Sequence, residues 1–277
     1  MVARPGCIEE LAEVVRGSGP FGFQQMGLWA LPCEAYAICA MPESSGGTLI
    51  NFSDLNQMVD YSPADLIITV GTGVTLREVN QLVGNAKLCV PYCADYAGGD
   101  DLSLGELIGY NLPHPREGQF GSWRDWILAT KQVLADGTIC KSGAKVVKSV
   151  AGYDIHKLFV GARGTLAAVA EVTLRLYPKP EPMPEARNSV NIIHRVLPSD
   201  FEALANIYRN AVFFDEAMAT VYANVPAFFE PPRFERDFVI RSGVGRMNIE
   251  PGQVNFLKRA KATLDPENKL NPGALIP

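Results

Sequence analysis

The chain has 277 residues, of which 47% are hydrophobic and 20% charged, and its net charge is −5 at pH 7. This composition is typical of a globular protein with enough apolar material for one large domain or two modest ones. A net negative charge without a basic block argues against a nucleic-acid-binding surface. The 25 glycines and 20 prolines are spread along the chain and predict many turns and few long helices.

Six cysteines are scattered along the chain, and none of them forms a CxxC pair or combines with histidine at zinc-site spacing. We interpret them as reduced thiols and predict no metal site, although a metal or iron–sulfur site at Cys89 and Cys93 remains an alternative. The opening segment "MVARPGCIEELAEVV" lacks the apolar stretch of a signal peptide. The apolar stretch 28–41 is too short to span a bilayer. These features predict a soluble, cytoplasmic protein without a transmembrane segment.

The first third of the chain reads as a helix, two strands and a second helix. Apolar residues at helical spacing predict a helix over 8–17, and apolar runs predict strands at 48–52 and 66–73. A threonine and a glutamate at capping-box spacing predict a helix over 75–84.

The middle of the chain combines glycine loops with strands. The segment 98–111 opens with two glycines and continues with a serine and a glutamate at capping-box spacing, which predicts a bare loop and a short helix. The segment 125–143 reads as two strands around an Asp-Gly turn, a strong hairpin signal. Asp154 predicts the cap of a short helix that ends at Gly161, and alternation over 171–177 predicts a strand.

Four prolines in 178–187 predict a domain boundary. Beyond it, Ser199 and Glu202 have capping-box spacing and predict an amphipathic helix over 199–212. The segment 225–238 is expected to be irregular, and the chain closes with a helix and a proline–glycine tail.

Two glycine loops, 98–105 and 161–164, lie far apart in the sequence. Glycine lets the backbone approach a ligand closely, and a glycine loop beside a helix start presents N–H groups to phosphate. Such loops suit a long, phosphate-bearing cofactor held by main chain, and simple turns and helix caps are the alternative. Neither a GxGxxG after a first strand nor a GxxxxGK[ST] is present, which excludes a Rossmann fingerprint and a P-loop.

Three segments, taken in order, resemble the FAD-binding domain of the vanillyl-alcohol-oxidase type, also called PCMH-type. They are "ADLIITVGTGVTLREVNQLV", "GSWRDWILATKQVLADGTI" and "KVVKSVAGYDIHKLFVGARGTLAAVAEVTLRLYPKP". The tail "LDPENKLNPGALIP" resembles the closing segment of the same superfamily. Within it, the chain most resembles the FAD-binding subunit of bacterial glycolate oxidase.

The resemblance implies an α+β fold with FAD as the cofactor. Residues 1–180 would form the PCMH-type FAD-binding domain, built of two α/β subdomains with FAD extended between them. Residues 181–277 would form a shortened cap region and a C-terminal tail that returns to the FAD domain.

The resemblance also implies contacts with FAD. Gly105 would face the flavin and the pyrophosphate, the backbone of Val169 would meet the adenine side, and Asn271 would lie near the isoalloxazine. The other candidates are Gly121, Ser122, Asp125, Gly152, Tyr153, Asp154, Gly161, Gly164 and Thr165. Each has a structural alternative: Asp154 as a helix cap, Asp125 as a turn former and Asn271 as part of a tail turn.

The chain departs from the family around the expected cofactor. Relatives carry an early phosphate loop of the form P-x-GGG-T, whereas the segment 21–49 has only the isolated Gly27 in the corresponding place. The loss of this cluster weakens the case for pyrophosphate binding, because backbone N–H groups approach phosphate where side chains are absent. Ala167 stands where glycine is usual, and His114 replaces a small residue of the second loop.

The catalytic half also looks reduced. The region 181–255 is shorter than the substrate-binding cap of relatives, and the H-x-GDGN-x-H metal motif of their catalytic subunits is missing from the sequence. Oxidation of a 2-hydroxyacid needs a base for the hydroxyl proton and a cation for the carboxylate. We identify no base, and Arg241 and Arg246 are either carboxylate ligands or surface residues.

Three functions compete. We expect an FAD-binding accessory subunit of a glycolate-oxidase-like 2-hydroxyacid dehydrogenase, an oxidoreductase subunit without a complete catalytic site of its own. It would pass electrons between a catalytic flavoprotein subunit and an iron–sulfur subunit, with the redox chemistry supplied by the cofactor. The second possibility is a non-catalytic assembly subunit that kept the fold and lost the flavin. The third is an independent FAD oxidoreductase acting on a small hydroxy acid.

Overall fold

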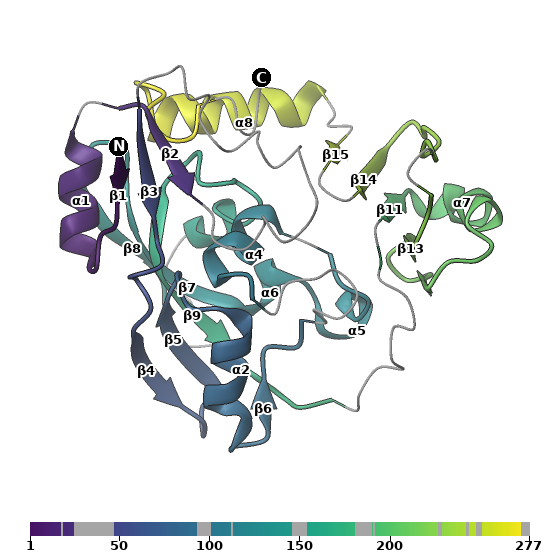
Figure 1. Cartoon of the computed structure of the whole chain (residues 1–277), viewed down its shortest axis with the longest axis horizontal. Helices are drawn as coiled ribbons and strands as arrows, with labels where there is room; N and C mark the ends of the chain where they lie inside the picture. Colours follow the sequence, from purple (N-terminus) through teal and green to yellow (C-terminus); the bar gives the residue numbers. More distant parts are fainter. Residues whose placement is uncertain are drawn as a thin grey trace.

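The computed structural model describes residues 1–17, 19–24, 47–92, 101–111, 113–145, 154–180, 190, 192–226, 229–241, 244–247 and 251–272. It mixes helices and strands, which confirms the expected α+β class (Figure 1). Within these residues the strands form four sheets, two of five strands, one of three and one of two.

The chain begins with a small parallel sheet in the order β1-β3-β2. Its strands are β1 (Val2–Ala3), β3 (Thr48–Asn51) and β2 (Phe21–Gln24), and helix α1 (Ile8–Arg16) runs beside them (Figure 1). The helix ends before Gly17 and β3 lies within the predicted 48–52, which confirms both predictions. The apolar face of α1 shares the first core with residues of β2 and β3 and with Val133, Ala168 and Ala170 of the sheet that follows.

A five-stranded antiparallel sheet follows, in the order β4-β5-β9-β7-β8. Its strands are β4 (Met58–Ser62), β5 (Ile67–Gly71), β9 (Ala168–Arg175), β7 (Ile127–Val133) and β8 (Ile139–Gly143). The predicted hairpin is confirmed as β7 and β8. Strand β9 begins three residues earlier than predicted, because its first residues pair with the end of β7.

Short helices cover this sheet and enclose the second core. They are α2 (Leu76–Gly84), α4 (Leu104–Tyr110), α5 (Glu117–Phe120) and α6 (Trp123–Trp126). Two of the three predicted capping boxes form, at the starts of α2 and α4. The two-stranded sheet pairs β6 (Leu88–Cys89) with β10 (Tyr177–Pro178) at the lower edge of this unit (Figure 1).

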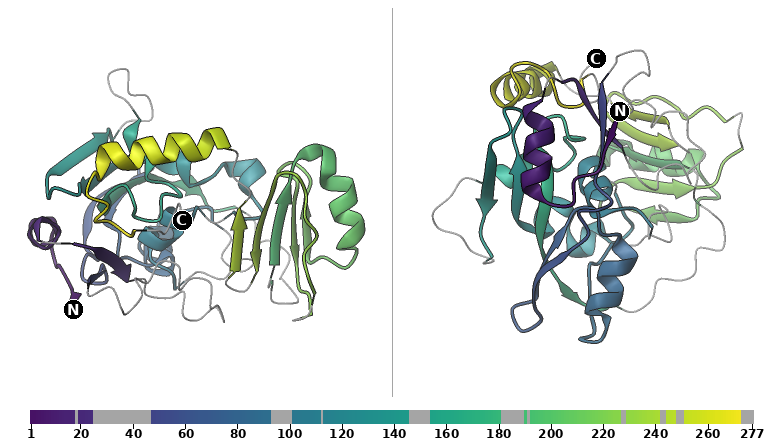
Figure 2. Two further views of the ribbon diagram at one scale, coloured as in Figure 1. Left: turned by 90° about the horizontal axis from the view of Figure 1, so that it is seen from above. Right: turned by 60° about the vertical axis from the view of Figure 1, so that its left-hand side comes forward.

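The C-terminal sheet was not predicted from the sequence. It has the order β12-β13-β11-β14-β15 and stands to one side of the first two sheets (Figure 2). Its strands are β12 (Phe213–Asp215), β13 (Thr220–Ala223), β11 (Ile192–Val196), β14 (Asp237–Arg241) and β15 (Val244–Met247). The predicted domain boundary stays a prediction, since most of 178–187 lies outside the described residues.

The helix that packs on this sheet, α7 (Phe201–Ile207), is shorter than predicted and lacks the expected capping box. The chain first makes a 3₁₀ turn over Pro198–Asp200, so Ser199 lies inside a turn and Asp200 takes the N-cap position. The prediction of a Ser199–Glu202 cap was therefore wrong. A proline at the first position favours this early start, because its fixed φ is already helical.

One ion pair connects the C-terminal sheet to the second unit. Arg195 on β11 donates to both carboxylate oxygens of Glu117 on α5, at 2.6 and 3.4 Å. Its Nε donates to Thr220 Oγ1 on β13 at 2.7 Å, which fixes the plane of the guanidinium. The Glu117 side chain is only 11% exposed, and a bidentate, half-buried pair of this kind is stronger and more directional than a surface ion pair.

His114 lies buried in a cluster of aromatic rings beside Tyr92 and Trp126. Its Nε2 donates to the carbonyl of Gly121 at 3.1 Å, and the N–H of Arg116 points at its Nδ1 at 3.4 Å. Both ring nitrogens are therefore satisfied when the imidazole is neutral. Burial lowers the pKa of His114 from 6.5 to about 4, against a smaller opposing effect of the Gly121 hydrogen bond.

This burial predicts a pH-dependent stability. Unfolding takes up a proton between the folded pKa of about 4 and the ordinary value of 6.5, so the free energy of unfolding falls as the pH falls through this window. We expect His114 to contribute a loss of about 3 kcal/mol across it, since one pKa unit corresponds to about 1.4 kcal/mol. Urea unfolding at a series of pH values measures this loss.

The variant His114→Gln isolates the residue, because glutamine keeps an N–H donor and has no titrating group. Its stability should depend less steeply on pH between 4 and 6.5 than that of the parent chain. Identical slopes for the two chains would show that His114 does not carry the dependence.

Candidate functional site

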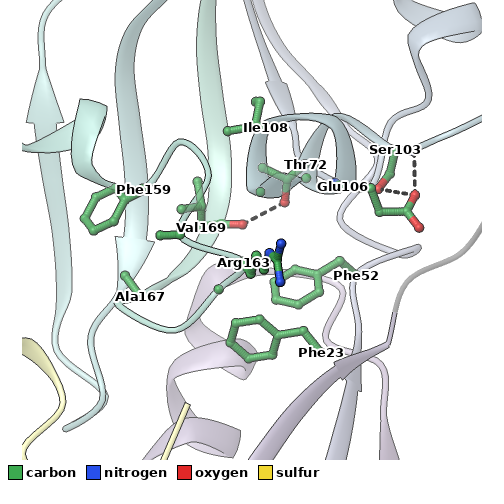
Figure 3. Close-up of a pocket in the computed structure, with 14 residues that line it drawn as sticks. Phe23, Phe52, Thr72, Ser103, Glu106, Ile108, Phe159, Arg163, Ala167 and Val169 are labelled. Carbon is green, nitrogen blue, oxygen red and sulfur yellow. Dashed lines mark hydrogen bonds between the residues drawn. The ribbon is translucent and has the colours of Figure 1, made fainter. Parts of the chain in front are cut away.

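A pocket lies where the first, parallel sheet meets the second unit (Figure 3). It encloses about 660 Å³ of empty space, solvent at its mouth included. The residues that line it are Phe23, Phe52, Thr72, Ser103, Gly105, Glu106, Ile108, Gly109, Phe159, Ala162, Arg163, Gly164, Ala167 and Val169.

Two phenylalanines form the wall on the side of the first sheet. Phe23 belongs to β2 and Phe52 follows β3, and their rings pack edge to face with centroids 5.2 Å apart. Opposite them, Thr72 donates its hydroxyl to the carbonyl of Val169 at 2.7 Å, which ties the end of β5 to β9 (Figure 3). The walls are thus mainly apolar and are fixed by hydrogen bonds behind them.

Gly105 brings helix α4 against the turn after β5. Its N–H donates to the carbonyl of Thr72 at 2.9 Å. A Cβ added at Gly105 would stand 3.2 Å from that carbonyl oxygen, closer than ordinary van der Waals contact. A side chain here would push the helix away from the turn, so glycine sets the depth of the pocket at this point.

The loop after η4 (Ile155–Leu158) forms the floor of the pocket. Gly164 has a φ of 68°, and a Cβ added to it would lie 2.2 Å from the ring of Phe23. The space that this glycine leaves is therefore occupied by the Phe23 ring. Arg163, with a φ of 52°, lies in the left-handed region that residues other than glycine seldom adopt.

Asn271 holds this loop to the first sheet. Its Oδ1 accepts from the N–H of Phe23 and its Nδ2 donates to the carbonyl of Arg163, both at 2.8 Å. Its own N–H donates to the carbonyl of Phe21, so the tail lies alongside β2. With 2% of its surface exposed, Asn271 is a buried connector between three segments.

Helix α8 (Pro251–Leu264) fixes the same loop through the side chain of Lys261. Lys261 donates to the carbonyls of Thr165 and Leu270 at 2.8 and 2.7 Å and to the carboxylate of Asp265. Asp265 in turn accepts from two backbone N–H groups of the tail. Burial lowers the pKa of Lys261, and the hydrogen bond and charge of the Asp265 carboxylate oppose that shift.

The predicted cofactor residues fall into several places. Gly105, Gly164 and Val169 line the pocket together, although they are far apart in sequence. Thr165 donates its hydroxyl to the carbonyl of Ala162 and stabilises the floor loop from within. Gly161 and Asn271 also support this loop. Gly152 and Tyr153 lie outside the described residues.

Gly121, Ser122 and Asp125 do not line this pocket. The Asp125 carboxylate accepts from the N–H and hydroxyl of Ser122, at 2.8 and 3.0 Å, and so caps the single turn of α6. Asp154 occupies the N-cap position of η4 without a side-chain cap bond, because its exposed carboxylate pairs with Lys157 at 3.3 Å. The prediction of a side-chain cap at Asp154 was therefore wrong.

Sequence reasoning missed Arg163, Phe23 and Phe52. Arg163 lies within the third of the segments that carried the resemblance but was not among the predicted contacts, and its guanidinium carbon lies 5.7 Å from the centre of the Tyr110 ring. Only the spatial arrangement identifies it as a pocket residue. Phe23 and Phe52 come from the short strands near the start of the chain, and no local pattern connects them to a glycine loop more than 100 residues away.

Aromatic walls, close backbone at Gly105 and an arginine suit a ligand that combines ring systems with phosphate, and FAD is such a ligand. In the described part of the chain no group of three or more His, Cys, Asp or Glu side chains is placed to hold a metal ion. Cys7, Cys89 and Cys140 are free thiols, and Cys93 lies outside the described residues. None of the described helices is long and apolar enough to cross a membrane.

Residues 34–143 match the family profile described as FAD binding domain. The chain is 29% identical over 219 residues to D-2-hydroxyglutarate dehydrogenase of Xanthomonas citri pv. viticola, which covers 75% of this chain and 41% of that protein. It is 35% identical over 138 residues to glycolate oxidase subunit GlcD of Bacillus subtilis (50% of this chain, 29% of that one). Glycolate oxidase subunit GlcE of Escherichia coli is 30% identical over 135 residues (49% and 38%).

The chain thus spans less than half the length of each of these relatives. Among solved structures, alkyldihydroxyacetonephosphate synthase superposes with a TM-score of 0.53 at 14% identity, over 75% of this chain and 36% of that one. At this identity the likeness concerns the fold alone. The matching profile identifies an FAD-binding domain within residues 34–143, and these similarities support FAD as its cofactor.

Proposed function

We propose that this chain is the FAD-binding accessory subunit of a glycolate-oxidase-like 2-hydroxyacid dehydrogenase in the cytoplasm. It would transfer electrons between a catalytic flavoprotein subunit and an iron–sulfur subunit of the same complex. The observation that carries the proposal is the pocket between the two N-terminal units, where Gly105, Gly164 and Val169 converge. The similarity to two glycolate oxidase subunits supports the choice of complex.

In this proposal residues 1–180 form the FAD-binding domain, and residues 181–277 form a reduced cap region and a tail that returns to it. The tail's return is supported by the contacts of Lys261 and Asn271 with the floor loop. Gly105, Gly164 and Val169 would contact FAD directly. Gly121, Ser122, Asp125, Gly152, Tyr153, Asp154, Gly161, Thr165 and Asn271 would contact it or position those that do.

The bound FAD supplies the redox chemistry. The chain's own residues would hold the cofactor, orient it through the rigid floor loop and exclude water with the walls of Phe23 and Phe52. The chain offers no identified base for a hydroxy acid, so substrate oxidation belongs to a partner in this proposal.

One observation favours a second candidate, an assembly subunit that has lost the flavin. The ring of Phe23 occupies the space beside Gly164, where a cofactor would otherwise approach the backbone. In that case the pocket would be a remnant of the fold, and the chain would act through its contacts with the other subunits.

The purified chain should be yellow and should release about one FAD per chain on denaturation, as a flavoprotein with a single site does. Its visible absorption spectrum and the acid-released cofactor measure this. A chain that is colourless, and stays so after incubation with FAD, would favour the assembly subunit instead.

The accessory role makes a separate prediction. Dithionite should bleach the flavin of the isolated chain, whereas glycolate or D-2-hydroxyglutarate alone should leave the spectrum unchanged, because the base and the substrate site lie on a partner. Rapid bleaching by either hydroxy acid would instead identify an independent oxidoreductase.

The two side-chain hydrogen bonds of Asn271 predict a loss of stability in the variant Asn271→Ala. Two buried hydrogen bonds disappear and the N–H of Phe23 loses its acceptor, so the free energy of unfolding should fall by about 2–4 kcal/mol. Urea unfolding of the flavin-free chain measures it. Asn206→Ala, at an exposed position of α7, is the matched control and should change little.

If Asn271 served only to contact the flavin and did not hold the floor loop to β2, the result would differ. The flavin-free variant would then be as stable as the parent chain, and only its affinity for FAD would fall.

A further inference from the structure

Arg163 is the only residue with a positive charge among the 14 that line the pocket. Figure 3 shows it beside Phe52, in the space between the two phenylalanines and Thr72. The one acidic residue of the lining, Glu106, is turned towards Ser103, whose N–H and hydroxyl both donate to its Oε2. In Figure 3 the Arg163 guanidinium lies near Phe52 and Thr72, and the Glu106 carboxylate lies beside Ser103.

The backbone of Arg163 is held on both sides. Its N–H donates to the carbonyl of Gly109 at 3.0 Å, and its carbonyl accepts from Asn271 at 2.8 Å. Its φ of 52° is one that non-glycine residues seldom adopt and that persists only where the surroundings enforce it. The backbone from which the Arg163 side chain extends is thus fixed before any ligand binds. This reduces the conformational entropy lost on binding.

FAD joins its flavin to its adenosine through two charged phosphates. Bringing these charges into a mainly apolar pocket is unfavourable unless a cation or several donors meet them. A guanidinium presents paired N–H donors that match two phosphate oxygens, and such charge-assisted bonds are stronger than neutral ones. Within the lining, only Arg163 brings both the charge and this geometry.

We propose that Arg163 binds the diphosphate of FAD, so that this pocket takes the diphosphate part of the dinucleotide. The inference rests on the proposed function, in that it requires FAD to bind. It adds which residue neutralises the phosphates and which part of the cofactor the pocket holds.

Equilibrium titrations of the flavin-free full chain with FAD, ADP and riboflavin test the inference. Arg163→Gln should weaken FAD and ADP binding by about 10- to 100-fold, the usual range for losing a charge-assisted hydrogen bond, and leave riboflavin binding unchanged. Arg163→Lys keeps the charge but not the paired donors. Its affinity for FAD and ADP should lie between that of the parent chain and that of Arg163→Gln. Arg209→Gln, an exposed arginine beyond the C-terminal end of α7, is the control and should match the parent chain.

The melting temperatures of the flavin-free variants show whether each one is folded. If Arg163→Gln does not fold, Arg163→Lys carries the test, with weaker FAD and ADP binding and unchanged riboflavin binding as the expected result. Equal FAD affinity in the Arg163 and Arg209 variants would overturn the role of Arg163 while leaving FAD binding intact. An equal loss for riboflavin would also overturn it, because the damage would then not concern the phosphates. A parent chain that binds no FAD would overturn both proposals.

Discussion

The partly buried ammonium group of Lys261 makes the contacts on which the pocket depends most. An ammonium has three N–H donors, and here they meet the carbonyls of Thr165 and Leu270 and the carboxylate of Asp265. Asp265 is 1% exposed and also accepts two backbone N–H groups of the tail. A buried charge is tolerated only when it is paired and fully hydrogen-bonded, and this pair fulfils both conditions.

This network explains why the end of the chain is part of a site built from its beginning. Lys261 connects α8 to the floor loop, and Asn271 connects the same loop to β2. Between them the tail runs beside β2 and covers its edge, which would otherwise expose unpaired backbone groups. The loop residues that face the pocket are therefore positioned by segments about 100 residues later and 140 residues earlier in the sequence.

The elements that could be predicted from the sequence are those with a local cause. The capping boxes of α2 and α4 and the Asp-Gly hairpin of β7 and β8 depend on residues within a few positions of one another. The C-terminal sheet was missed because its strands have only three to five residues. Its central strand β11 also pairs with β13 and β14, which lie well beyond it in the sequence. The Ser199 cap failed because Pro198 starts its turn earlier than the capping pattern allows.

The candidate site, like the fold, could be predicted from the sequence only in part. Gly105 and Gly164 come from the two predicted glycine loops, and both line the pocket. What approaches them was not predictable: a carbonyl of the chain itself at Gly105 and the ring of Phe23 at Gly164. The position of Arg163 in the pocket likewise depends on how the two units meet, and no spacing in the sequence encodes it.

The location of the pocket couples cofactor binding to the packing of the two units. Its walls belong to different hydrophobic cores, with Phe23 in the core of α1 and the first sheet, and Phe159 and Ala167 in a cluster that reaches α8. A ligand in a pocket between two units contacts both of them. It stabilises the folded chain by an amount that grows with the ligand concentration relative to the dissociation constant. Without a ligand, the two units are joined at the pocket by the hydrogen bonds of Asn271 and Lys261 and by the contact of Phe23 with Gly164. The Phe23 ring therefore has two contacts at once, because it packs against Gly164 of the floor loop and also lines the pocket.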